Sequence, residues 1–267
     1  MKINPAIANE FSTAAFRFGH TLIRDKFTRY DENDQKIKAI NFTDMSFKSD
    51  LAYNIKGEGI QSILRGMVTD KCKKFGSFGF ELQNKLFGKI ENNEFTAIDL
   101  LSANIQRGRD HGIRPYVDYV KICHGIDAKD FNDLLPLTTA ENILLLRNAY
   151  QNVGDVDLYP GSILEEKISN LGLVSSTFAC IIKRQFADLK NGDRFYYENG
   201  PSVNPSAFTL DQLAEIKKVT LSGLICSNYD ISSLPQRVFF LPTFENPKVS
   251  CDNLKNQINL DLWTGIL

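Results

Sequence analysis

Apolar residues recur at helical spacing along most of the chain, and this pattern predicts a mainly α-helical protein. The opening segment shows the pattern first. Asn4 can cap a helix, Pro5 suits the first helical position, and apolar side chains recur from there to Leu22. Further helices are predicted over residues 57–87, 139–150, 175–189 and 209–219.

Asp99 is predicted to cap one more helix, which Gly108 and Gly112 bring to an end. Strand signals are few and short, and Val238-Phe239-Phe240 is an example. The polar stretch from Arg24 to Asn41 contains a run of acidic and amide side chains, so we expect a solvated connector there.

Composition narrows the possible function classes. Hydrophobic residues make up 43% of the chain and charged residues 24%, as in ordinary soluble proteins. A net charge of -1 without a run of Lys or Arg argues against nucleic-acid binding. No apolar stretch approaches the ~20 residues that span a bilayer, so we expect no transmembrane segment. Pro and Gly are scattered rather than clustered into a linker, and we expect residues 1–267 to form a single domain.

The residues alone leave the cellular compartment open. The stretch from Met1 to Pro5 lacks the apolar region of a signal peptide, which taken alone indicates a cytosolic chain. Five cysteines point the other way, although an odd count in a chain of this length is weak evidence. An N-glycosylation sequon, Asn41-Phe42-Thr43, fits a secreted glycoprotein.

Only three histidines are available as metal ligands: His20, His111 and His124. A helical histidine among phenylalanines is more often a hydrogen-bonded core residue than a ligand. For His20, three neighbouring features strengthen the alternative interpretation as a haem ligand. Gly19 leaves room for a flat macrocycle, Arg17 lies on the same helical face, and Phe16 and Phe18 can exclude water. A haem iron with one axial histidine and an open sixth position supports peroxide chemistry.

The chain carries two motifs in a fixed order: Phe16-Arg17-Phe18-Gly19-His20-Thr21-Leu22-Ile23 and Asn104-Ile105-Gln106-Arg107-Gly108-Arg109-Asp110-His111-Gly112. Together they resemble the animal haem peroxidase family, the group of peroxidasin, thyroid peroxidase, myeloperoxidase and lactoperoxidase. The resemblance runs from about Asn9 to Trp263. It implies a mainly α, animal haem peroxidase-like helical fold that is partial, with the distal half absent.

The resemblance implies roles for four residues around an iron protoporphyrin. His20 is the proximal, axial ligand of the iron, and Asn104 fixes its other ring nitrogen. Arg17 and Arg107 are expected at the haem propionates. The alternatives stay open: Asn104 can satisfy a backbone group instead, and Arg107 can pair with a surface carboxylate. We expect His111 to be structural, since adjacent side chains on a helix point in different directions and cannot form a catalytic pair.

The resemblance also implies two disulfides, one between Cys123 and Cys180 and one between Cys226 and Cys251. Each would constrain the unfolded chain by roughly 3–4.5 kcal/mol in the loop-entropy model. Cys72 has no family partner, so it is either free or pairs outside this chain. Five reduced cysteines in a cytosolic protein remain an alternative.

The implied function is haem-dependent peroxidase activity, in which hydrogen peroxide drives oxidation of a halide, a phenol such as tyrosine, or another small electron donor. The family's distal histidine and arginine, its calcium loop and its haem-linking carboxylates have no counterpart here. We therefore expect the C-terminal, proximal-haem part of a secreted peroxidase. Calcium is expected for the full-length family, with its site outside this chain. The alternative is a catalytically dead haem-binding or structural relic of the scaffold.

Overall fold

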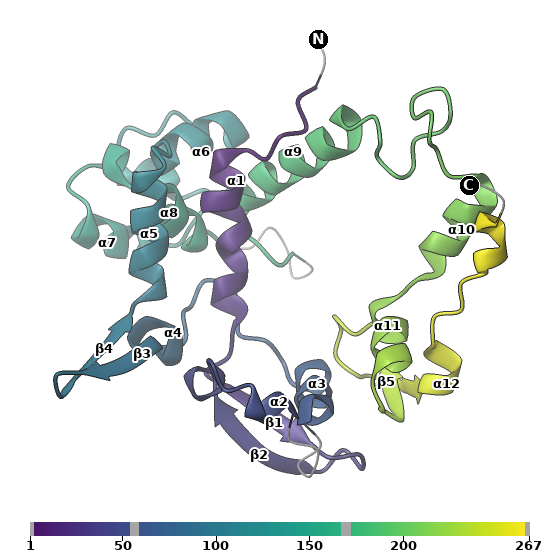
Figure 1. Cartoon of the computed structure of the whole chain (residues 1–267). Coiled ribbons are helices and arrows are strands. Elements are labelled where there is room, and N and C mark those ends of the chain that lie inside the picture. The colour runs from purple at the N-terminus through teal and green to yellow at the C-terminus, as the bar shows by residue number, and fades with distance from the viewer. Residues whose placement is uncertain (1–2, 54–58, 167–171, 265–267) are drawn as a thin grey trace. The chain divides into compact units, whose positions relative to one another are not determined.

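The computed structural model describes residues 3–53, 59–166 and 172–264, and it confirms a mainly helical chain with few short strands. The chain divides into two compact units. Figure 1 labels the helices and strands that belong to them. The first unit takes its residues from 1–24 and 73–193, and the second unit from 25–72 and 194–267. Each unit is thus assembled from two stretches that are far apart in the sequence.

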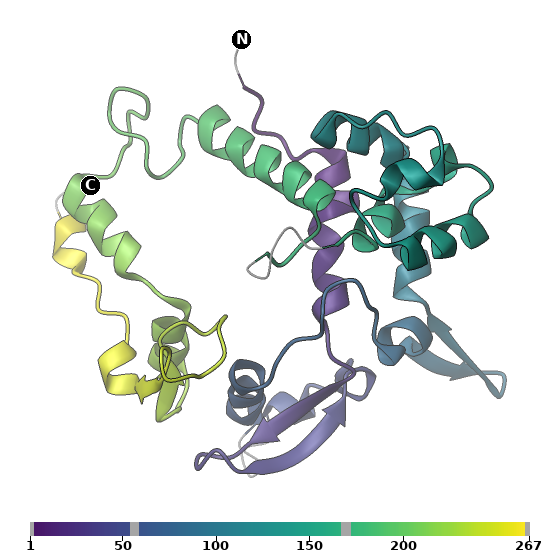
Figure 2. The same cartoon turned by 180° about the vertical axis from the view of Figure 1, so that it is seen from behind.

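The first unit is mostly helical. Its elements, in chain order, are α1 (Asn9–Thr13), the 3-10 helix η1 (Ala15–Leu22), α4 (Phe80–Asn84), β3 (Leu86–Glu91), β4 (Glu94–Ile98), α5 (Leu100–Asp110), α6 (Tyr116–His124), η4 (Phe131–Leu134), α7 (Ala140–Ala149), η5 (Val153–Asp155), α8 (Leu158–Ile163) and α9 (Ser176–Gly192). Both views show α1 and η1 running between α5 and α9 (Figures 1 and 2). The core of this unit is built on large buried side chains, among them Tyr116, Tyr159 and Phe178.

The first helix begins later than predicted and is not α-helical throughout. Asn4 does not cap it: α1 starts at Asn9, and the chain continues as η1. The reason is a tertiary contact that the spacing does not reveal. Gln185 on α9 accepts from the Ala8 backbone N–H (2.6 Å) and donates to the Ala6 carbonyl (3.3 Å). These two bonds hold the segment before α1 against α9, and Ala8 there has an extended backbone.

Helices with a strong capping residue lie where the sequence predicts them. Asp99 caps α5 by accepting from the Leu101 N–H (2.9 Å), and Thr139 caps α7 in the same way. Thr209 and Gln212 form a capping box at the start of α10 (Leu210–Lys218). The α5 helix passes through Gly108 and ends at Asp110, so the prediction that Gly108 breaks it was wrong.

The helix predicted over 57–87 is two shorter helices, α3 (Gly59–Thr69) and α4. Gly57 lies outside the described residues. Gly76 interrupts the helical pattern because its φ of 91° is left-handed, and a Cβ there would lie 2.9 Å from the Ile163 carbonyl oxygen.

Two β-hairpins were not predicted. The segment expected to be a solvated connector instead forms a hairpin of β1 (Lys26–Tyr30) and β2 (Lys36–Asn41). The second hairpin pairs β3 with β4. Most of β2, β3 and β4 is exposed, so these strands lack the clean alternation of a strand with one buried face. The predicted strand Val238-Phe239-Phe240 lies in a turn instead, close to the short pair of β5 (Ser233–Pro235) and β6 (Lys248–Ser250).

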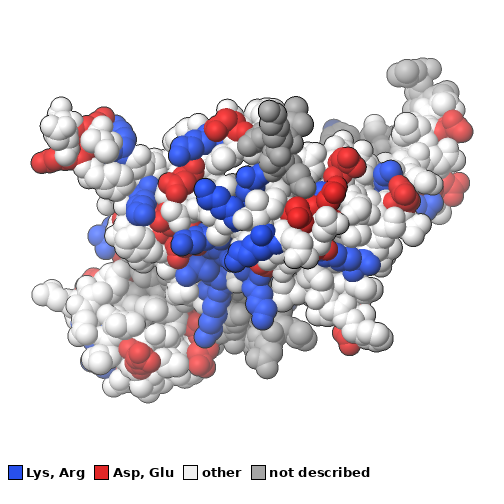
Figure 3. Space-filling view, turned by 90° about the horizontal axis from the view of Figure 1, so that it is seen from below, with Lys and Arg blue, Asp and Glu red and all other residues white. Residues whose placement is uncertain are grey.

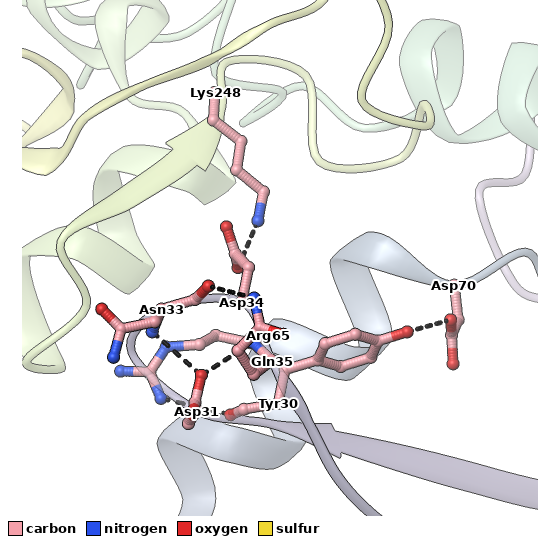
Figure 4. Close-up of polar contacts among 8 residues, drawn as sticks. All are labelled: Tyr30, Asp31, Asn33, Asp34, Gln35, Arg65, Asp70 and Lys248. Carbon is pink, nitrogen blue, oxygen red and sulfur yellow. Dashed lines mark hydrogen bonds and ion pairs between the residues drawn. The ribbon is translucent and has the colours of Figure 1, made fainter.

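The second unit also contains the 3-10 helix η2 (Thr43–Met45), α2 (Asp50–Tyr53), α3, α10 (Leu210–Lys218), α11 (Leu221–Asn228), α12 (Cys251–Leu254) and η6 (Leu260–Trp263). A polar cluster joins its two stretches (Figure 4). Asp31 closes the β1–β2 turn by accepting from the backbone N–H groups of Asn33 (3.0 Å) and Gln35 (2.7 Å). Lys248 reaches from β6 to Asp34 at 2.5 Å. The second unit has a small hydrophobic core that includes Ile225, Leu234 and Val68.

Charge on the surface is mixed in sign. On the face drawn in Figure 3, Lys and Arg side chains are interspersed with Asp and Glu side chains. Within the ranges that the structure describes, no helix is both long and apolar enough to cross a membrane.

Candidate functional site

The predicted site lies in the first unit and centres on one buried amide. Asn104 on α5 is fully buried, with an exposed fraction of 0%. Its Nδ2 lies 3.0 Å from His20 Nδ1, and its Oδ1 accepts a longer hydrogen bond from Arg17 (3.4 Å). The structure therefore brings together three of the four predicted residues, which come from segments more than 80 positions apart.

Local structure explains why Arg17 and His20 act on the same amide. Both lie in η1, and a 3-10 helix has three residues per turn, so side chains three positions apart lie on one side. The Tyr159 hydroxyl donates to the Arg17 carbonyl oxygen (3.1 Å) and anchors the backbone one turn before His20. The Tyr159 ring is itself buried, with ring centroids 6.3 Å from Phe78 and 5.9 Å from Phe178.

The surroundings favour a neutral imidazole. Burial lowers the pKa of His20 below its usual 6.5, and the nearby positive charge of Arg17 lowers it further. The contact with Asn104 acts in the opposite direction and is the smallest of the three influences. Neutral imidazole is the form that ligates metals, so the electrostatics suit a ligand.

The ring is also accessible from one side. His20 is only half-buried, and its Nε2 makes no hydrogen bond with any residue in the described ranges. A Cβ built on Gly19 would meet no heavy atom within 4 Å, so open space lies beside the histidine. Phe16, with 52% of its surface exposed, adds an apolar edge. An imidazole nitrogen, an open glycine face, apolar rings and a neighbouring cation together fit a haem.

Arg107 is placed differently from the other three residues. It lies one turn after Asn104 on α5, is exposed, and has Nη1 3.6 Å from the carboxylate of Asp110. This ion pair matches the alternative stated for Arg107, in which it pairs with a surface carboxylate.

The remaining histidines make contacts within the scaffold. His111 Nδ1 lies 3.1 Å from Asn9 Oδ1, and Asn9 donates back to the His111 carbonyl (3.0 Å). These contacts link the end of α5 to the start of α1. His124 Nε2 lies 3.0 Å from the Thr177 hydroxyl.

Arg109 forms a bidentate ion pair with Asp157, in which Nε donates to Oδ1 (3.0 Å) and Nη2 donates to Oδ2 (2.7 Å). The Tyr150 hydroxyl donates to the same carboxylate (2.8 Å). Burial, followed by the contact with Asp157, raises the pKa of Tyr150 to about 12.

Both predicted disulfides are present. Cys123 is bonded to Cys180 within the first unit, and Cys226 to Cys251 within the second. Cys72 is exposed and forms no disulfide with another described cysteine.

The sequence did not predict the residues that position the backbone around Arg17 and before α1. No local pattern in the sequence indicates that the Tyr159 hydroxyl reaches the Arg17 carbonyl. The same holds for Gln185, whose amide pins the segment before α1.

Comparison with known proteins decides the family. A model of the animal haem peroxidase family matches residues 1–239. The chain belongs to the animal haem peroxidase family. Membership implies haem as the cofactor.

Characterised relatives agree over nearly the whole chain. Chorion peroxidase of Drosophila melanogaster is 36% identical over 98% of this chain, and heme peroxidase 2 of Caenorhabditis elegans is 34% identical over 97%. The human peroxidasin homolog is 36% identical over 98% of the chain. The chain spans only 32%, 36% and 17% of these relatives, respectively.

Solved structures support the same fold. Peroxidase A from Dictyostelium discoideum aligns with a TM-score of 0.64 and 31% identity, over 80% of this chain and 41% of that protein. The Oryza sativa fatty acid alpha-dioxygenase aligns with a TM-score of 0.56 over 75% of this chain and 34% of the enzyme. At 20% identity, this second likeness concerns the fold alone.

Proposed function

We propose that this chain forms the proximal side of a haem site in a peroxidase, with His20 as the axial ligand of the iron. The observation that carries the proposal is the 3.0 Å contact between His20 Nδ1 and the fully buried amide of Asn104. A ligating histidine needs its second ring nitrogen fixed by a neighbour, and Asn104 is the neighbour of Nδ1, while Nε2 has no hydrogen-bond partner among the described residues.

The orientation of the amide decides which ring nitrogen carries the proton. Arginine can only donate, so Oδ1 of Asn104 faces Arg17 and Nδ2 faces His20. A ring that ligates through Nε2 carries its proton on Nδ1, which requires Oδ1 to face the ring instead. That orientation ends the bond from Arg17, and we propose that its guanidinium then pairs with a haem propionate, as does Arg107.

Haem, when bound, supplies an iron centre that reacts with hydrogen peroxide. The residues of this chain hold and adjust the group. His20 ligates, Asn104 keeps the ring in one orientation, and Phe16 and Phe18 limit the access of water. Since a carboxamide accepts a proton less strongly than a carboxylate, Asn104 keeps the imidazole closer to neutral than an aspartate would. The proposed reaction is peroxide-driven oxidation of a halide, a phenol such as tyrosine, or another small donor.

The relatives contain a large part that this chain does not match. We propose that peroxide turnover uses residues that the relatives carry outside the matched third, together with a calcium site there. The match to residues 1–239 runs through both compact units and supports a single catalytic domain. Two disulfides support an extracellular location, because they persist in oxidising compartments.

A haem titration of the purified chain tests the ligand. We expect binding of haemin with the absorption spectrum of histidine-ligated iron, and loss of that spectrum in His20→Gln. His111→Gln and His124→Gln are matched controls, since they remove the other two histidines and should leave the spectrum unchanged. Equal binding by His20→Gln would contradict the assignment. No haem uptake by the unmodified chain would favour the structural relic.

A further inference from the structure

A modification site lies in the second unit, where β2 ends. Two places in the 267 residues have Asn followed two positions later by Ser or Thr: Asn41-Phe42-Thr43 and Asn204-Pro205-Ser206. Only the first is an acceptor sequon, because proline in the middle position blocks the second. We propose that Asn41 carries an N-linked glycan. The proposal does not depend on haem binding.

The backbone presents this sequon on a turn. Asn41 is the last residue of β2 and pairs with Lys26. The chain then leaves the hairpin, with the Phe42 N–H bonded to the Asp25 carbonyl (2.8 Å), and enters η2 at Thr43. A strand end that passes directly into a surface turn can carry a bulky substituent without displacing a packed element.

The side chain of Asn41 makes few contacts that a glycan would disrupt. Asn41 is only half-buried, and its Nδ2 donates to the carboxylate of Asp44 (2.8 Å), which is itself exposed. In the transfer, Nδ2 bonds to C1 of the first sugar of a lipid-diphosphate-linked oligosaccharide. The C1–phosphate oxygen bond breaks, the lipid diphosphate leaves, and Nδ2 releases one proton. The attached amide keeps one N–H, so a contact with Asp44 remains available.

The blocked tripeptide Asn204-Pro205-Ser206 provides an internal control. Asn204 is 5% exposed, and its Oδ1 accepts from the Ser206 N–H at 2.9 Å. Its side chain is therefore buried and its sequon is blocked. The structure and the sequence thus agree that one asparagine is available and the other is not.

The compartment is consistent with modification. N-linked glycans are added in the secretory pathway, and the two disulfides, Cys123–Cys180 and Cys226–Cys251, also form under its oxidising conditions.

Expression of the whole chain behind a secretion signal in insect cells tests the proposal. Trypsin releases residues 39–48 as one peptide, because Lys38 and Lys48 flank it. We expect this peptide to carry a glycan that peptide N-glycosidase removes, leaving aspartate at position 41. Asn41→Gln and Thr43→Ala should abolish the mobility shift of the protein, whereas Thr43→Ser should retain it because serine preserves the sequon.

Formation of the disulfides shows that a molecule has entered the oxidising compartment. An unmodified 39–48 peptide in such molecules would overturn the proposal. So would a mobility shift that survives in Thr43→Ala, because the glycan would then lie elsewhere. Neither result would bear on the ligand role of His20.

Discussion

At the scale of residues, the candidate site is defined by what Asn104 touches. The sequence predicted His20, Asn104 and Arg17 as members of one site, and the structure brings the three together. The order of the motifs was enough because these residues lie within two short strings that resemble motifs of the family. Tyr159 could not be predicted in the same way, since its contact with the Arg17 carbonyl depends on how α8 packs against η1.

Replacing Asn104 with aspartate should lower the reduction potential of the haem iron. A carboxylate accepts more strongly from the ring N–H and makes the imidazole more anionic, which stabilises the oxidised iron. Spectroelectrochemical titration of the haem-loaded chain measures the shift. Gln106→Glu is the matched control, because it adds the same charge to an exposed position on α5. Equal potentials in the unmodified chain and Asn104→Asp would remove this role.

His20 should titrate below pH 6.5 in the haem-free chain, because burial and Arg17 both disfavour its charged form. Above pH 6.5 the ring is neutral in both folded and unfolded chains. As the pH falls below 6.5 the unfolded chain takes up the proton first, so the free energy of unfolding decreases until the folded ring is protonated as well.

NMR titration of the imidazole resonances checks this prediction. Arg17→Gln should raise the pKa of His20 by removing the nearby positive charge, and it should make the loss of stability below pH 6.5 smaller, because the folded chain then takes up the proton at a pH closer to that of the unfolded chain. A pKa that is the same with and without Arg17 would show that burial acts alone.

At the scale of elements, the sequence predicted helices that begin with a strong cap and missed strands without a buried face. Asp99, Thr139 and Thr209 determine helix starts through local bonds, so their sequence signal is sufficient. The hairpin of β1 and β2 depends instead on cross-strand bonds and on the Asp31 turn (Figure 4). The start of α1 depends on Gln185, which is distant in sequence.

Glu165 determines how three helices of the first unit meet. Its buried carboxylate accepts from the Tyr116 hydroxyl on α6 (2.7 Å), and from the Ser176 hydroxyl (2.9 Å) and the Thr177 N–H (2.9 Å) at the start of α9. The Thr177 hydroxyl donates to it as well. Because Glu165 lies two residues after the end of α8, its side chain links α8 to both neighbouring helices.

Glu165→Gln should lower the free energy of unfolding by about 3 kcal/mol, because the new NH2 group faces donors and leaves buried groups unpaired. Urea unfolding measures the change. Glu166→Gln is the control: the adjacent carboxylate is exposed, so its loss should change stability by no more than about 0.5 kcal/mol. Similar values for the two variants would contradict the role of Glu165.

At the scale of the whole molecule, the division into two units could not be predicted from composition. Each unit combines two separated stretches, so no linker-like segment marks a boundary. The disulfide pairing was predictable only through the family resemblance, because spacing alone does not assign connectivity. The structure places one disulfide in each unit, and each therefore stabilises a different part of the molecule.

Removing the Cys123–Cys180 bond, which spans 57 positions, should cost about 4 kcal/mol in the loop-entropy model. The Cys226–Cys251 bond spans 25 positions and should contribute about 3.5 kcal/mol. Paired Cys→Ala variants followed by hydrogen exchange test the assignment. The largest loss of protection should lie in the unit that held the removed bond. A larger loss in the other unit would contradict it.

Replacing His20 with glycine and adding imidazole from outside tests whether His20 ligates the haem iron. We expect His20→Gly to lose the electron paramagnetic resonance signature of histidine-ligated ferric haem, and added imidazole to restore it. The unmodified chain should show that signature without imidazole. A variant that keeps histidine ligation with no imidazole present would show that another residue binds the iron.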